Sequence, residues 1–267
     1  MTRYGLAAAM WLVVTAAVGA ELKVESVQAA NGPFGPARPH WDFYPHDELY
    51  LRFVVSGVRV DLEGKTDVEL TLRVSDAQGK VALEREQKLQ GVLMLGGGTF
   101  TSYARLAFAD PLPEGVYTVT VIVQDRLGKD VTTFERKLIA RGPAFAIVAP
   151  QFFYDPEGRV PAPAGGVVGQ TVFFRLRVIG FDRSQDKVDA EMSVQVLDAD
   201  GKEILPRPIT ASVRSDDAQA VKRSTHLNFT GDVPLSRPGN FTLRITVTDK
   251  LGQKTTTLET PLRVHAP

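Results

Sequence analysis

The chain of 267 residues contains no cysteine, so disulfides, thiolate metal sites and a cysteine nucleophile are all excluded. It also lacks net charge, because 31 basic residues balance 31 acidic ones. This balance removes the electrostatic argument for nucleic acid as a partner. No Gly-x-Ser-x-Gly or other nucleophile signature occurs. We therefore expect a protein that is not an enzyme and uses no cofactor.

The first 20 residues have the pattern of a secretory signal peptide. Arg3 precedes an apolar run from Leu6 to Val18, and the small residues Gly19 and Ala20 stand just before Glu21. A transmembrane anchor is the alternative, but the run of about 13 residues is short for a span of about 20. Cleavage after Ala20 would leave a mature chain of 30 basic and 31 acidic residues without a membrane span. We expect export to the periplasm or the extracellular space.

A long phrase occurs twice in the mature chain. TVTVIVQDRLGKDVTTFERKL begins at Thr118, and LRITVTDKLGQKTTTLETPL begins at Leu243. Further landmarks pair in order at nearly the same offset: Gly57 with Gly180, Gly79 with Gly201, Gly115 with Gly239, and Tyr117 with Phe241. The repeat predicts a duplicated domain, with residues 21–141 as the first copy and residues 142–267 as the second.

Apolar residues alternate with polar ones in both copies, which is the period of a β-strand with one buried face. The alternating apolar series are Tyr117, Val119, Val121, Val123 in the first copy and Phe241, Leu243, Ile245, Val247 in the second. Short strands separated by Gly, Pro and Asp predict an all-β fold of two tandem antiparallel sandwiches. No helical period of comparable length follows the signal peptide.

The stretch LPEGVYTVTV, Leu112 to Val121, carries a resemblance to a known class of domain. A turn feeds a strand headed by Tyr117, as in the tyrosine corner of β-sandwiches. Each copy resembles an immunoglobulin-like or fibronectin type III-like domain, as in tandem sandwich proteins of bacterial envelopes. The second copy, SRPGNFTLRI, departs from the pattern by placing Phe241 where the Tyr would stand.

The densest cluster of unusual residues is PHWDFYPHDE, Pro39 to Glu48. Its histidines and carboxylates could bind a transition metal, but their spacing matches no known ligand set. Aligned with APQFFYDPEG in the second copy, it suggests aromatic faces for a sugar or peptide. The candidate ligand-binding residues are Trp41, Phe43, Tyr44, Phe153 and Tyr154. The alternative is that these aromatics cover the open end of a sandwich.

Three turn-like stretches offer weaker hypotheses. Asp198 and Asp200 precede Gly201 with calcium-loop spacing, but the distal Glu is missing, so a hairpin turn is favoured. The glycines of LMLGGGTF, Leu93 to Phe100, predict a flexible crossover between sheets rather than a phosphate loop. The repeated Asp-basic-Leu-Gly is interpreted as a structural turn with the Gly at positive φ. Its residues are Asp125 and Gly128, and Asp249 and Gly252.

These observations favour an exported structural or binding module whose partner is an envelope protein or a glycan. The first alternative is a carbohydrate-binding or carbohydrate-processing accessory protein that uses the aromatic clusters. The second is a two-domain periplasmic chaperone, which would present a basic cleft and an exposed edge strand for pairing. No cleft motif of that kind is recognisable in the sequence.

Overall fold

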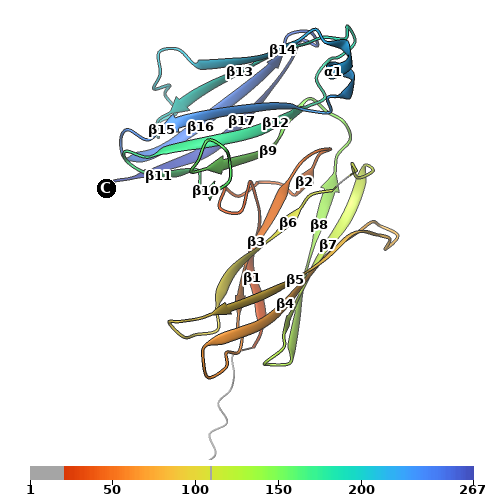
Figure 1. Ribbon diagram of the computed structural model, residues 1–267, viewed down its shortest axis with the longest axis vertical. Helices are drawn as coiled ribbons and strands as arrows, with labels where there is room; N and C mark the ends of the chain where they lie inside the picture. The colour runs from red at the N-terminus through yellow and green to blue at the C-terminus, as the bar shows by residue number, and fades with distance from the viewer. Residues whose placement is uncertain (1–20, 109) are drawn as a thin grey trace, which may run out of the picture.

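The protein is all-β, as the alternating pattern predicts (Figure 1). The computed structural model describes residues 21–108 and 110–267, so the predicted signal peptide, residues 1–20, lies outside the described residues. Within these ranges the one helix is α1 (Ala218–Arg223), which is capped by the side chain of Asp217 and was not expected from the sequence. Every other regular element there is a strand or an isolated bridge.

The first eight strands form two sheets that enclose one core. A three-stranded sheet has the order β1-β3-β6, and a five-stranded sheet has the order β2-β8-β7-β4-β5. Buried Leu51 and Phe53 of the small sheet pack in one cluster with Leu70, Leu72 and Val121 of the large sheet. The strands are β1 (Lys23–Ala30), β2 (Asp42–Phe43), β3 (Leu49–Ser56), β4 (Lys65–Ser75), β5 (Val81–Val92), β6 (Phe100–Leu106), β7 (Gly115–Asp125) and β8 (Asp130–Ala140).

The remaining strands repeat this arrangement and add one edge strand, β10, to the smaller sheet. The sheet orders are β10-β9-β12-β15 and β11-β17-β16-β13-β14, around a second core that includes Phe174, Met192 and Ile245. Five residues, 141–145, connect β8 to β9. The strands are β9 (Ala146–Phe153), β10 (Pro161–Ala162), β11 (Gly165–Val167), β12 (Thr171–Ile179), β13 (Val188–Leu197), β14 (Ile209–Ser215), β15 (Leu227–Pro234), β16 (Gly239–Asp249) and β17 (Lys254–His265).

The two strand orders correct one alignment made from the sequence. Residues 39–48 contain β2, which pairs in parallel with β8. The counterpart of β2 is β11, which pairs in parallel with β17, whereas residues 149–158 belong to β9 and the turn after it. The aromatic residues that the two stretches share therefore do not mark equivalent positions, because the backbone pairing places the two stretches in different strands. Because β2 and β11 each pair in parallel at the edge of a sheet, the larger sheet of each sandwich is mixed rather than purely antiparallel.

The predicted inward faces are confirmed. Val119, Val121 and Val123 are fully buried, as are their counterparts in β16. The tyrosine corner is also present, because the Tyr117 hydroxyl donates a hydrogen bond to the Pro113 carbonyl over 3.1 Å. Phe241 keeps its ring half-buried and lies under the guanidinium of Arg237 instead. The predicted glycine crossover also connects the two sheets, since it links β5 to β6.

Candidate functional site

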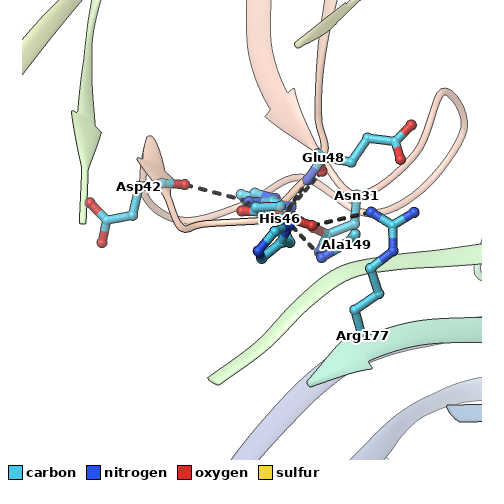
Figure 2. Close-up of polar contacts among 8 residues, drawn as sticks. Asn31, Asp42, His46, Glu48, Ala149 and Arg177 are labelled. Carbon is cyan, nitrogen blue, oxygen red and sulfur yellow. Dashed lines mark hydrogen bonds and ion pairs between the residues drawn. The ribbon is translucent and has the colours of Figure 1, made fainter. Parts of the chain in front are cut away.

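The unusual segment Pro39 to Glu48 lies at the junction between the two halves (Figure 2). Its end is a tight turn in which the Asp47 amide donates to the Tyr44 carbonyl over 3.1 Å. His46 occupies the left-handed region with φ at 59°, and β3 then begins at Leu49. The turn thus projects its last residues from the N-terminal half toward β9 and β12.

Asp47 is the centre of this junction. Its carboxylate is almost completely buried and forms a bidentate ion pair with Arg38, at 2.7 and 2.9 Å. The same carboxylate accepts hydrogen bonds from the amides of Glu48, at 2.7 Å, and of Ala149, at 2.9 Å. Ala149 belongs to the C-terminal half and stands at a bulge of β9 with φ at 48°. One fully bonded carboxylate therefore connects the two halves.

Arg38 is held as firmly as its partner. Its Nε donates to Asn31 Oδ1 over 2.6 Å, and its Nη2 donates to the carbonyl oxygen of Glu48 over 2.8 Å. Charge-assisted, bidentate bonds of this kind are among the stronger hydrogen bonds in proteins. With a longer bond of 3.5 Å to the Asp42 carbonyl, the guanidinium is fixed by four different residues, and it supplies the positive charge that a buried carboxylate requires.

A second contact across the junction involves two histidines. Arg177 of β12 donates from Nη1 to the His46 carbonyl over 3.2 Å (Figure 2). The rings of His46 and His226 have centroids 5.7 Å apart. Burial first, and then the electrostatic interactions with Arg177 and the His46 ring, lower the pKa of His226 below its usual range. His226 is half-buried and faces the junction.

Glu48 lies beside this contact in a hollow of about 420 Å³ that Gln151, Phe153 and Arg175 also line. Its carboxylate accepts a hydrogen bond from the Tyr50 hydroxyl over 2.9 Å and pairs with Arg105. Burial, and then the negative charge of Glu48, raise the pKa of Tyr50. The carboxylates of Asp47 and Glu48 are thus already bonded to protein groups, and the third carboxylate of the segment, Asp42, pairs with Arg141, so the arrangement supports packing better than acid–base chemistry.

The structure separates the candidate ligand-binding aromatics. Phe43 is buried in the core, edge-on to Phe108 at 5.1 Å between ring centroids. Phe153 is buried under the guanidinium of Arg175, while Trp41 and Tyr44 are half-buried. Tyr154 alone of the five is exposed. They therefore form no common aromatic face.

The weak calcium candidate forms a turn. Asp198 Oδ1 accepts hydrogen bonds from the amides of Asp200 and Lys202, and Gly201 has φ at 78°. The first copy makes the same bonds with Asp76 as the acceptor. In the part of the chain that the structure describes, no group of three metal-ligating side chains gathers. The bonding explains both Asp and Gly in these turns.

Asp125 and Asp249 hold the repeated hairpins, but the glycine has a different reason than expected. Asp125 Oδ1 accepts from the amides of Leu127 and Gly128, and its Oδ2 accepts from the backbone amide of Arg59 over 2.8 Å. The positive φ falls on the following residues, Lys129 and Gln253. At Gly128 and Gly252 a Cβ would lie 2.6 Å from the Asp carboxylate. Close approach to the carboxylate, not positive φ, requires glycine here.

Sequence reasoning missed the residues that complete the junction. Arg38, Asn31, Ala149 and Arg177 are scattered over about 150 residues, and none belongs to a recognisable motif. One usable signal was the pair Asp47 and Glu48 directly before the apolar strand β3. Acidic residues that become buried at the start of a core strand need a partner, which points to a nearby Arg.

Comparisons with known proteins add little about function. No protein-family model and no curated protein matches the chain. The chain is similar to a red sea bream transglutaminase at 11% identity, covering 92% of this chain and 31% of that one, with a TM-score of 0.28. It is similar to dimeric latent PorU from Porphyromonas gingivalis at 15% identity, covering 94% and 21%, with a TM-score of 0.37. The chain spans less than a third of either protein.

Among the described residues, no helix combines the length and the apolar character needed to cross a membrane.

Proposed function

We propose that the protein is an exported, non-enzymatic module of the cell envelope or extracellular space. Its two sandwich halves are held in one relative orientation, and its outer surface binds an envelope protein or a glycan. The observation that carries this proposal is the use of Asp47, which binds Arg38 within its own half and the Ala149 amide of the other half. The most distinctive polar segment of the chain thus serves the junction.

The bonding state of the acidic residues supports a non-enzymatic role. Asp47 and Glu48 are buried and neutralised by Arg38 and Arg105, and Asp125 and Asp249 are occupied by turn amides. A general acid or base needs access to substrate and a proton to exchange. Asp47, Asp125 and Asp249, which are buried with every partner inside the protein, meet neither condition, and Glu48 is held in its hollow by Tyr50 and Arg105.

The test pairs binding with turnover, using residues 21–267. An envelope partner captured by the wild type should be captured poorly by Asp47→Ala, because that change frees the two halves to reorient. Asp42→Asn is the control, since Asp42 pairs with Arg141 near the surface and joins no residue of β9–β17. Hydrolase or transferase turnover that disappears in Asp42→Asn, with the fold intact, would overturn the proposal.

A glycan is favoured as a second candidate by the hollow around Trp41, which His40, Asp42 and Arg141 also line. A half-buried indole beside a charged pair offers an apolar face and polar groups to a sugar ring. Binding on a glycan array that is lost in Trp41→Ala and retained in Tyr154→Ala would support this candidate. Equal binding by both variants would exclude the hollow as the site.

A further inference from the structure

The end of the N-terminal half farthest from the junction has an exposed apolar surface. β3 runs from Leu49 at the junction to Ser56 at this end, where three loops meet: residues 57–64, 93–99 and 126–129 (Figure 1). The first two are joined by the Leu93 amide, which donates to the Gly64 carbonyl over 2.9 Å. Leu127 of the third lines one hollow with Lys65 and Val92. The three loops therefore form one surface.

We call this surface the apolar tip and define it by its exposed apolar residues. Leu62, Leu95 and Met94 have relative exposures of 107%, 103% and 89%, and no other exposed large apolar side chain of the described residues exceeds 60%. Less exposed neighbours complete the surface: Val60, Val92 and Leu127. Large apolar side chains held fully in water at a single end indicate an interaction surface.

The position of the N-terminal strand indicates what covers the tip. Glu21 and Lys23, at the start of the described chain, line a hollow together with Gly57, Arg59 and Gly98 of the tip loops. The apolar run Leu6 to Val18 is joined to the fold at this end. A run of that character enters a membrane during export, whether it is later cleaved or retained. The tip is thus the end of the fold that lies beside Glu21, the residue through which this run is attached.

Charge at the tip favours apolar insertion over attraction to anionic headgroups. Lys65 pairs with Glu63, and Arg126 pairs with Glu69. The other basic residues of these loops, Arg59 and Lys129, have the acidic residues Asp61 and Asp130 close to them in the sequence, so the tip has no excess of positive charge. A protein surface without excess positive charge gains little from attraction to anionic lipids, so its affinity for a bilayer depends on the apolar area that it buries there. We propose that the apolar tip inserts Leu62, Met94 and Leu95 into the interface of a lipid bilayer.

The inference rests on the proposed export of the chain, but its test is made in vitro and does not depend on the junction. The chain has no cysteine, so Leu95→Cys gives a single site for an environment-sensitive fluorophore. Ile204→Cys is the matched control, since Ile204 is an exposed apolar residue of the other half. With phosphatidylcholine vesicles, fluorescence should shift to the blue at position 95 and stay unchanged at position 204.

Co-sedimentation with the same vesicles tests the unlabelled protein. The triple variant Leu62→Ser, Met94→Ser, Leu95→Ser should bind the vesicles at least roughly tenfold more weakly than the wild type, because three apolar side chains are lost. Ile204→Ser with Ile209→Ser should bind as the wild type does. Addition of phosphatidylglycerol or of salt should change little. All these residues are exposed, so each variant should keep its thermal transition.

Two results would overturn the proposal. One is a fluorophore at position 95 that does not respond to vesicles of either composition. The other is a dimer that the triple variant abolishes while vesicles remain unbound, which would make a second copy the occupant of the tip. A negative result for lipid would leave the proposed role of the junction intact, because Asp47 lies at the opposite end of β3.

Discussion

At the scale of single residues, Asp125 and Asp249 each organise a hairpin and its neighbouring loop. One oxygen accepts two amides of the turn, and the other reaches the loop before β4 or β13, at Arg59 or Asp182. Both carboxylates are buried, so their hydrogen bonds replace the water they lost on folding. The glycine three residues later leaves room for this carboxylate.

Gly128→Val should therefore lower the free energy of unfolding by about 1 to 3 kcal/mol, as overpacking typically does. The new Cβ would stand 2.6 Å from Asp125 Oδ2. Gly91→Val is the control, because no atom lies within 4 Å of its added Cβ. Urea unfolding of both variants measures the difference. Equal stability of the two would show that the carboxylate moves aside without cost.

His226 should make stability depend on pH. Its pKa is lowered in the folded protein, so between that value and about 6.5 the unfolded chain binds more protons than the folded one. The free energy of unfolding should rise with pH through this window and level off above it. His226→Gln should flatten the rise in urea titrations between pH 5 and 7.5. An unchanged slope would assign the effect to other groups.

At the scale of elements, alternation identified the long strands because each buries one face. β4, β7 and β16 follow the predicted pattern closely. The short parallel strands β2 and β11 have two and three residues, too few for a period to be visible. The helix α1 rests on a single cap and one buried residue, Val221, so its sequence carries no helical pattern either.

Two leucines, Leu70 and Leu62, allow the effect of burial on stability to be measured for the same residue type. Leu70 is buried in β4, whereas Leu62 is fully exposed in the preceding loop. Leu70→Ala should cost about 2 to 5 kcal/mol, since a core cavity adds to the lost burial. Leu62→Ala should change stability by less than about 0.5 kcal/mol. Calorimetry of the two variants gives the comparison, and a large cost at Leu62 would place that side chain in a packed environment.

At the scale of the whole molecule, the fold could be predicted and the junction could not. The repeat and the alternating pattern determine two sandwiches, because duplicated strands bury duplicated faces. The junction depends on Arg38, Asp47 and Ala149, which meet only when the two halves are placed together. Nothing in the local sequence encodes that placement. The segment Pro39 to Glu48 is recognisably unusual in the sequence, but its role follows from a contact between residues more than 100 positions apart, Asp47 and Ala149.

Asp47→Ala should remove the principal bond across the junction and leave Arg38 without its carboxylate. Loss of one partner of a buried ion pair typically costs about 3 to 5 kcal/mol. We expect the N-terminal half to melt earlier and separately, giving two calorimetric transitions. Asp42→Asn should cost less than about 1 kcal/mol, because its pair with Arg141 is partly exposed. A single unchanged transition in Asp47→Ala would show that other contacts hold the halves.

The distance between the halves tests the central claim most directly. Spin labels attached through Gln87→Cys in β5 and Ser212→Cys in β14 would report on the relative orientation of the two sandwiches, because both sites lie on exposed edge strands. We predict one narrow distance distribution in residues 21–267 and a broad one after Asp47→Ala. A broad distribution in the protein with Asp47 intact would contradict the claim that the junction fixes the two halves.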